Sequence, residues 1–211
     1  MQHDFQFVPK SEWLPVRKQL EELIHLVQDE VRDCFTFSFT YVGSSSRNMI
    51  TYDRKSNIGY DFDVNIHVND DDENYTAKEI RDILRIAFTK HMAKFGYKHC
   101  EDSTRVLTIK DVDPFLSRIC HSCDFCIVYD CSDGRQQYIH FNKEQRTYNW
   151  QYLPVSNKAL EEKAEWIVKN GKKEELEDIY LYKKNKNTNP DKRSRSLYAE
   201  SVSEIYQIYH K

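Results

Sequence analysis

The sequence lacks several features that would place it in a class at once. It has no uncharged apolar run long enough to cross a bilayer, and its first twenty residues contain neither the apolar core nor the cleavage site of a secretion signal. Positive charge is not in excess, because 31 Lys and Arg stand against 34 Asp and Glu. This balance disfavours a general nucleic-acid coat or a membrane-attracted surface. We therefore expect a cytoplasmic protein with no membrane partner.

Several common catalytic motifs are missing as well. The sequence shows no Gly-rich Walker loop, no Rossmann fingerprint, no Ser/His/Asp set and no internal repeat. It does have the apolar residues for a core, since 39% of its 211 residues are hydrophobic and 13% are aromatic, while 31% are charged. This composition indicates a well-solvated globular protein of one domain, or of one domain with a small appendage.

Six cysteines lie in apolar or strand-like stretches, and we interpret them as reduced, mostly buried thiols. Cys120, Cys123 and Cys126, with His121 beside them, would suggest zinc if they converged from turns. On a strand, however, residues three apart point to opposite faces, so Cys123 is expected to point away from the other two. Buried thiols are therefore the preferred interpretation.

The hydrophobic pattern predicts an α+β fold. A helix is expected near residues 14–27, and the alternating run CFTFSFTYV then predicts a strand that ends at Gly43. After a second strand at residues 60–68, Thr76 is expected to cap a helix that stops at Gly96. Further strands are predicted at 105–109, 123–130 and 137–141, the last two as a hairpin.

The pattern becomes helical from Pro154 onward. Three segments have this character: NKALEEKAEWIVKNG, KKEELEDIYLYKKNK and SRSLYAESVSEIYQIYHK. A polar, basic and turn-rich stretch separates the last two. We therefore predict a mixed-sheet core over residues 1–153 and a C-terminal helical layer or domain over residues 154–211.

The segment YDFDVNIHV, residues 60–68, places acidic side chains on one face of its strand. Asp61 and Asp63 share a face because side chains alternate along a strand, and their Cα atoms are about 7 Å apart. The opposite face is strongly apolar: Tyr60, Phe62, Val64, Ile66 and Val68. Two carboxylates this close raise each other's pKa unless a cation lies between them, and a hard divalent cation suits oxygen ligands.

A solvated edge strand is the alternative explanation of the two aspartates. A third acid, Asp124, interrupts the later apolar strand HSCDFCIVYD, where an unpaired carboxylate is costly to bury. This recurrence favours the cation site. His67 continues the face of the aspartates, either as a substrate contact or as a partly exposed histidine at the strand end. The aromatic stretch FNKEQRTYNWQYLP could stack bases, but ordinary packing explains it better.

Three motifs in this order resemble the signature of the DNA polymerase beta-like nucleotidyltransferase superfamily. They are VGSSSR, YDFDVNI and CDFCIV, and the resemblance covers roughly the first two-thirds of the chain. It implies that Asp61, Asp63 and Asp124 converge as catalytic residues and as ligands of two Mg²⁺ (or Mn²⁺) ions. The implied reaction is in-line transfer of NMP from an NTP to an acceptor hydroxyl, with release of pyrophosphate.

The resemblance also implies nucleotide contacts. Gly43 would let the backbone approach the phosphates, and Ser44 would donate hydrogen bonds to them. Basic residues of the superfamily's helical appendage can reach the triphosphate, and Lys184, beside Lys183, is the candidate here. Arg47, just after the serines, is a further candidate. For the lysine pair, an ordinary solvated helix face is the alternative.

The sequence departs from the superfamily pattern in two ways. Asn48 and Met49 stand where a Gly-Thr or similar pair is usual, and the link from Gly43 to Asp61 is longer than usual. The acceptor stays open between a small molecule such as an antibiotic or nucleotide, an RNA end and a protein hydroxyl. The alternative function is a catalytically inactive nucleotide- or partner-binding protein on the same fold, such as an antitoxin-like regulator.

Overall fold

The computed structural model describes residues 3–70, 72–155 and 157–210. Its backbone contacts divide the chain into two compact units. The sheet unit comprises Val8–Ile50 and Asn57–Pro154. The helical unit comprises the segment that ends at Phe7, the segment Thr51–Ser56 and the chain from Val155 onward. Two short segments from the predicted core range therefore group with the C-terminal helices.

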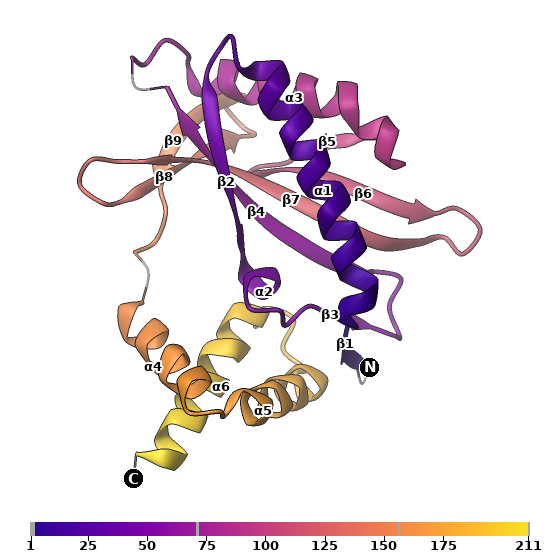
Figure 1. The fold of residues 1–211 in the computed structure, drawn as a ribbon, viewed down its shortest axis with the longest axis vertical. Helices are drawn as coiled ribbons and strands as arrows, with labels where there is room; N and C mark the ends of the chain where they lie inside the picture. The colour runs from indigo at the N-terminus through magenta and orange to yellow at the C-terminus, as the bar shows by residue number, and fades with distance from the viewer. Residues whose placement is uncertain (1–2, 71, 156, 211) are drawn as a thin grey trace. The chain divides into compact units, whose positions relative to one another are not determined.

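The sheet unit is built on a mixed β-sheet with the strand order β2-β4-β7-β6-β5 (Figure 1). Strands β4 and β7 run parallel, and the other neighbouring pairs are antiparallel. Strand β8 pairs with the end of β7, and β9 pairs with β8. The predicted α+β class with a mixed sheet is confirmed. The strands are β2 (Thr36–Val42), β4 (Tyr60–Asn69), β5 (Cys100–Asp102), β6 (Val106–Asp113), β7 (Arg118–Asp130), β8 (Gln136–Asn142) and β9 (Thr147–Tyr152).

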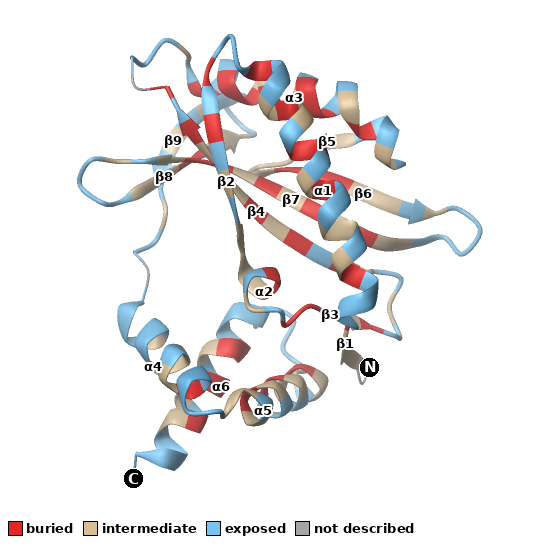
Figure 2. Cartoon of the chain, viewed as in Figure 1, coloured by how far each residue is buried: buried red, intermediate tan, exposed pale blue. Residues whose placement is uncertain are grey.

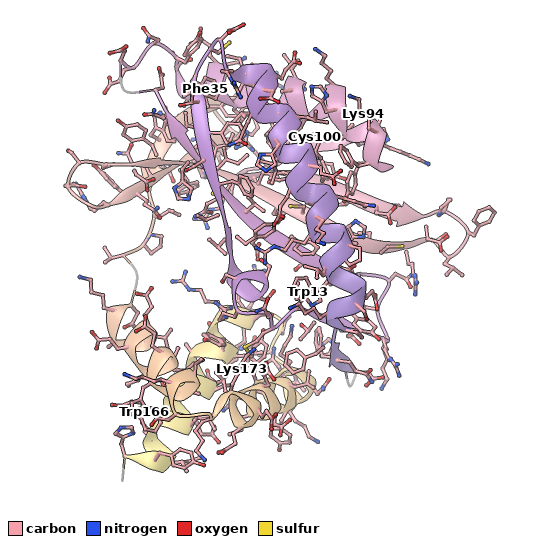
Figure 3. The ribbon with its side chains drawn as sticks, viewed as in Figure 1. Trp13, Phe35, Lys94, Cys100, Trp166 and Lys173 are labelled. Carbon is pink, nitrogen blue, oxygen red and sulfur yellow. The ribbon has the colours of Figure 1, made fainter. Side chains whose placement is uncertain are left out.

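Helices α1 (Lys10–Val31) and α3 (Ala77–His91) lie side by side against one face of this sheet (Figure 1). The predicted start of α3 is confirmed, because the Thr76 hydroxyl accepts from the backbone N–H of Glu79 and the Glu79 carboxylate accepts from that of Thr76. The 3₁₀ turn η1 (Met92–Phe95) follows α3 and ends at Gly96, which is left-handed. Trp13 and Phe35, near opposite ends of α1, are both buried (Figure 3).

The core lies between these helices and the sheet. Strand β4 alternates between buried and partly exposed residues, as the sequence predicts, and Phe62, Val64 and Ile66 are fully buried (Figure 2). Phe88 of α3 stacks on Phe125 of β7 with ring centroids 4.2 Å apart. Each such side chain contributes roughly 1.5–3 kcal/mol when it leaves water. The opposite face of β4 is thereby held in a fixed position and presents its polar side chains.

A buried arginine connects α3 to β5, β6 and β8 through hydrogen bonds. Arg81 is fully buried, and its Nε atom donates to the Asp102 carboxylate at 2.7 Å. Its Nη atoms donate to the backbone carbonyls of Ser103, Val106 and Ile139. These bonds satisfy backbone groups from the β5–β6 turn and from β8, which a buried apolar side chain could not do.

The helical unit contains α4 (Lys158–Lys169), α5 (Lys173–Lys186) and α6 (Ser194–Tyr209), which confirms the three helices predicted after Pro154. Trp166 of α4, labelled in Figure 3, packs against Tyr206 and His210 near the end of α6. The unit also holds β1 (Phe5–Phe7), paired antiparallel with β3 (Thr51–Asp53). None of the helices in residues 3–70, 72–155 and 157–210 is long and apolar enough to span a membrane.

The cysteines are all free thiols. The expectation that most of them are buried is wrong: only Cys123 is buried, Cys34 is exposed and the other four are intermediate. Their register explains this difference, because Cys123 lies on the apolar face of β7 while Cys120 and Cys126 lie on the polar face. Burial raises the pKa of Cys126 to about 11, so this thiol stays protonated near neutral pH and is a poor nucleophile and metal ligand.

Candidate active site

The acidic site lies on the polar face of the two parallel strands in the middle of the sheet. Asp61 and Asp63 lie on the same face of β4, and Asp63 is the register partner of Asp124 on β7. Adjacent strands are about 4.8 Å apart, so the carboxylates of Asp63 and Asp124 face one another across a single strand gap. The pairing of β4 with β7 therefore places Asp63 beside Asp124, with Asp61 two residues away on the same face of β4.

The carboxylates repel one another, and burial strengthens this effect. Burial, followed by the charges of Asp61 and Asp124, raises the pKa of Asp63 to about 6, and Arg47 opposes this rise. Burial also raises the pKa of Asp124, against a 2.6 Å hydrogen bond from the hydroxyl of Thr108. Without a cation, Asp63 therefore takes up a proton at a higher pH than an ordinary aspartate.

Gly43 closes the site at the end of β2, where the short helix α2 (Gly43–Ser46) begins. Its φ angle is +66°, and a Cβ atom at this position would lie 2.5 Å from Oδ2 of Asp63. Only glycine fits this backbone conformation and this contact without displacing the carboxylate. The structure therefore explains why glycine is needed at position 43 apart from the predicted approach to phosphate: Asp63 occupies the space that a side chain would fill.

The serines after Gly43 shape the turn. Ser45 is buried and Ser46 is exposed, and their hydroxyls donate to the backbone carbonyls of Val42 and Gly43. Ser44 is partly exposed, and its carbonyl accepts from the backbone N–H groups of Arg47 and Met49. The assignments of Gly43, Ser44 and Arg47 as nucleotide contacts stay predictions.

The structure also accounts for the two residues that differ from the superfamily pattern. Asn48 has a left-handed backbone with φ of +55°, a conformation that asparagine tolerates well, and Met49 is almost fully buried in the core. The long link that follows contains β3, which belongs to the helical unit. Part of the long link is therefore an ordered strand, which pairs with β1.

Lys184 lies in the helical unit. It is almost fully buried, and its Nζ atom donates to Oγ1 of Thr51 at 2.6 Å. The same ammonium lies 4.1 Å from the ring centroid of Phe5. The alternative of a solvated helix face is therefore wrong for Lys184, whereas Lys183 forms an ion pair with Glu204. The role of Lys184 in nucleotide binding stays a prediction.

The donor set at the site is suited to a hard cation that brings other ligands with it. Among the described residues, no group of three or more His, Cys, Asp or Glu side chains could hold a metal ion by itself. Mg²⁺ is usually bound by one or two carboxylates together with substrate phosphates, not by an all-protein cage. Asp63, whose burial and neighbours disfavour its own charge, and Asp124 fit this pattern.

Sequence reasoning missed two residues next to the acids. Thr108 of β6 is the register partner of Asp124 and holds its Oδ1 atom, and the charge of Lys110 lowers the pKa of Asp124. Neither residue carries a recognisable motif. The only signal was that residues 105–109 form a strand, and the register of that strand against β7 is not visible in the sequence.

No protein-family model and no curated protein matches the sequence, but solved structures match the fold. Vibrio cholerae DncV bound to GTP has a TM-score of 0.56 and 16% identity, over 95% of this chain and 53% of that protein. The c-di-GMP synthase CdnE of Capnocytophaga granulosa has a TM-score of 0.53 and 17% identity, over 88% of this chain and 57% of that protein.

A third neighbour is the CD-NTase CdnG of Bradyrhizobium diazoefficiens in complex with GTP, with a TM-score of 0.52 and 14% identity. The match covers 74% of this chain and 42% of that protein. The chain spans about half the length of the solved structures that it matches. The chain shares the fold of these solved structures, and this confirms the nucleotidyltransferase fold that the resemblance of its three motifs predicted.

Proposed function

We propose that the protein is a metal-dependent nucleotidyltransferase that transfers NMP from an NTP to an acceptor hydroxyl and releases pyrophosphate. The observation that carries this proposal is the pairing of Asp63 with Asp124 beside Gly43, with the pKa of Asp63 raised to about 6. A divalent cation would neutralise these carboxylates and would bind phosphate oxygens at the same time. Perturbed carboxylates that converge on an open face are typical of a catalytic centre.

Each residue has a defined task in this proposal. Asp61, Asp63 and Asp124 hold the divalent cations, while Gly43, Ser44 and Arg47 contact the phosphates and Lys184 adds a positive charge. A bound divalent cation would stabilise the charge on the α-phosphate and on the departing pyrophosphate. The hydroxyl of Thr108 keeps the Asp124 carboxylate oriented. The rigid sheet fixes the reacting groups for in-line attack.

We further propose that the acceptor is the hydroxyl of a second nucleotide. The solved neighbours support this choice, since CdnE is a c-di-GMP synthase and DncV is a cyclic AMP-GMP synthase. One DncV structure is a complex with the linear intermediate pppA(3′,5′)pG. The polar sheet face around Asp124 is the side from which such an acceptor would approach the donor.

The test incubates the purified chain with α-³²P-labelled ATP, GTP, CTP or UTP, alone and in pairs, with Mg²⁺ or Mn²⁺. We expect a new labelled product on thin-layer chromatography together with pyrophosphate. Asp63→Asn and Asp124→Asn should lower its formation by roughly 10²-fold or more, because a charge-stabilising group is lost. Asp33→Asn, an exposed aspartate of the same unit, is the matched control and should leave the rate unchanged.

Two outcomes would contradict the proposal. NTP binding that needs no metal and gives no product would indicate the inactive binding protein instead. A product that Asp63→Asn and Asp124→Asn form as fast as the unaltered protein would exclude these carboxylates as the catalytic centre. Thermal shift with NTP, with and without metal, separates metal-dependent binding from metal-independent binding.

A further inference from the structure

Three side chains from different strands form a hydrogen-bonded chain on the polar face of the sheet. His67 of β4 lies between Thr40 of β2 and Asp130 at the end of β7. Its Nδ1 atom is 2.8 Å from Oδ2 of Asp130, and its Nε2 atom is 2.8 Å from Oγ1 of Thr40. The His67 side chain is only 16% exposed, so its ring is held in this position.

The chemistry of the partners fixes the direction of these bonds in the neutral imidazole. A carboxylate only accepts, so the Nδ1–H of His67 donates to Asp130 and its Nε2 atom accepts from the Thr40 hydroxyl. The other oxygen of Asp130 accepts from Nε2 of Gln136 at 2.7 Å. Burial alone would raise the pKa of Asp130, but its hydrogen bonds from Gln136 and His67 lower it below the ordinary value.

This arrangement has the order of groups that activates a hydroxyl in nucleophilic catalysis. A nucleophile that donates to a histidine, which in turn donates to a carboxylate, is recognised by geometry and not by sequence order. No such set was visible in the sequence, because Thr40 and His67 lie 27 residues apart and His67 and Asp130 lie 63 residues apart. Only the pairing of β4 with β2 and β7 brings them together.

Thr40 lies on the face of the sheet that carries the acidic site. Thr40 is the register partner of Asn65, and Val42 is the register partner of Asp63. Thr40 and Asp63 are therefore diagonal neighbours on one face, with Cα atoms about 7–8 Å apart. Thr40 is also exposed, so its hydroxyl can reach a bound ligand.

We propose that Thr40 is a site of self-nucleotidylation, in which the protein transfers NMP from a bound NTP to its own threonine. This inference rests on the proposed function, because the donor is the NTP at Asp63 and Asp124. Oγ1 of Thr40 attacks the α-phosphorus, the bond from that phosphorus to the bridging oxygen breaks, and pyrophosphate leaves with the electron pair. The hydroxyl proton passes to Nε2 of His67, and the Asp130 carboxylate stabilises the imidazolium.

A second threonine of β2 provides the comparison for Thr40. Thr36 lies four residues before Thr40 on the same face of β2. Its Oγ1 atom accepts from Nδ2 of Asn69 at 3.3 Å. An amide cannot take a proton from a hydroxyl in this way. Thr36 therefore shares the residue type, the strand and the face of Thr40 but has no base, which makes Thr36→Val the matched control.

The experiment incubates the full chain with α-³²P- or γ-³²P-labelled NTPs and Mn²⁺, then measures soluble products and protein-bound label in the same reaction. We expect the α label, and not the γ label, on the denatured protein, with peptide mass spectrometry assigning one NMP to Thr40. Thr40→Val should lose the label, Thr40→Ser should keep it and Thr36→Val should match the unaltered protein. His67→Gln should slow labelling by roughly 10²–10⁴-fold.

The outcomes separate this inference from the proposed function. Soluble nucleotide products without protein-bound label, or label on a residue other than Thr40, would overturn self-nucleotidylation and leave the transferase proposal intact. Labelling of Thr40→Val at the rate of the unaltered protein would overturn it as well. If neither soluble product nor label forms with any NTP and either metal, both proposals fail. Circular dichroism of Thr40→Val and Thr40→Ser checks that both variants are folded.

Discussion

Gly43 lies so close to Asp63 that a Cβ atom on Gly43 would be 2.5 Å from Oδ2 of the aspartate. Real Cβ atoms do not make contacts this short, so any side chain at position 43 must displace the carboxylate. The φ angle of +66° restricts the position independently. The Gly-Ser turn and the acidic strand, 20 residues apart in the sequence, are thus parts of one site.

We expect Gly43→Ala to lower the stability of the protein by more than the cost of a left-handed alanine, and to weaken Mn²⁺-dependent NTP binding. The left-handed conformation costs alanine about 1–2 kcal/mol, and the contact with Asp63 adds to this cost. Gly134→Ala is the matched control, because Gly134 has a φ of +79° and nothing lies within 4 Å of its Cβ position. Chemical denaturation measures both losses, and calorimetry measures Mn²⁺-dependent NTP affinity. Equal losses of stability with unchanged affinity would show that the contact does not constrain Asp63.

Asp63 should make the stability of the metal-free protein depend on pH. Its pKa is raised from 3.8 to about 6, so the folded state binds more protons than the unfolded state between these values. The stability that this group contributes is present below about pH 4 and is lost as the pH rises through 6. The loss is roughly 3 kcal/mol at about 1.4 kcal/mol per pKa unit.

Asp63→Asn tests this pH dependence because it removes the ionisable group and keeps the shape. We expect the variant to be more stable than the unaltered protein at pH 7.5 and to lose this advantage near pH 4, as measured by urea denaturation without metal. Asp33→Asn, at an exposed aspartate, is the control. A drop in stability of Asp63→Asn at pH 7.5 would mean that the carboxylate makes structural bonds that an amide cannot replace.

Alternation and spacing were enough to predict the polar and apolar faces of β4 and the position of the acids. Phe62 and Ile66 are buried and Asp61 is exposed, as period-2 alternation requires. The start of α3 was likewise predicted from the capping residue Thr76, and the structure adds Glu79, three residues later, as its reciprocal partner. Features that depend on a few neighbouring residues could therefore be predicted from the sequence.

Features that depend on strand register could not be predicted. The pairing of Thr108 with Asp124 and the chain from Thr40 through His67 to Asp130 require knowledge of which strands are neighbours and of how they align. Strands β1 and β3 are three residues each and pair with one another across more than 40 residues of sequence. Such short strands carry too few residues for a periodic signal, so β1 and β3 were missed.

Arg81 should be among the most costly side chains to remove from the sheet unit. Arg81→Met removes the buried partner of the Asp102 carboxylate and one donor from each of three backbone carbonyls, so we expect a loss of roughly 3–5 kcal/mol. Arg85→Met, one turn further along α3, is the control. Its ion pair with Asp82 is partly exposed and should contribute less than about 1 kcal/mol. Similar losses from both variants in urea denaturation would contradict a structural role for Arg81.

Lys184 holds Thr51 through a hydrogen bond and is also predicted to contact the triphosphate, and substitutions can distinguish these two roles. Its ammonium donates to Thr51, so Lys184→Met should destabilise the protein by roughly 1.5–3 kcal/mol, the range for a hydrogen bond to a charged group. Thr51→Val removes the same hydrogen bond but keeps the positive charge. If Lys184 also contacts the triphosphate, Lys184→Met should weaken NTP binding, as measured by calorimetry, about tenfold more than Thr51→Val, a difference of about 1.4 kcal/mol.

Lys183→Met serves as the control for a general loss of positive charge, because Lys183 is the sequence neighbour of Lys184 and pairs with Glu204. We expect Lys183→Met to change both stability and NTP affinity little, since a partly exposed ion pair contributes at most about 1 kcal/mol. If Lys184→Met and Thr51→Val weaken NTP binding equally, the ammonium acts only by holding Thr51 and does not touch the nucleotide. Equal weakening by Lys183→Met and Lys184→Met would instead show that the helix contributes only its overall charge.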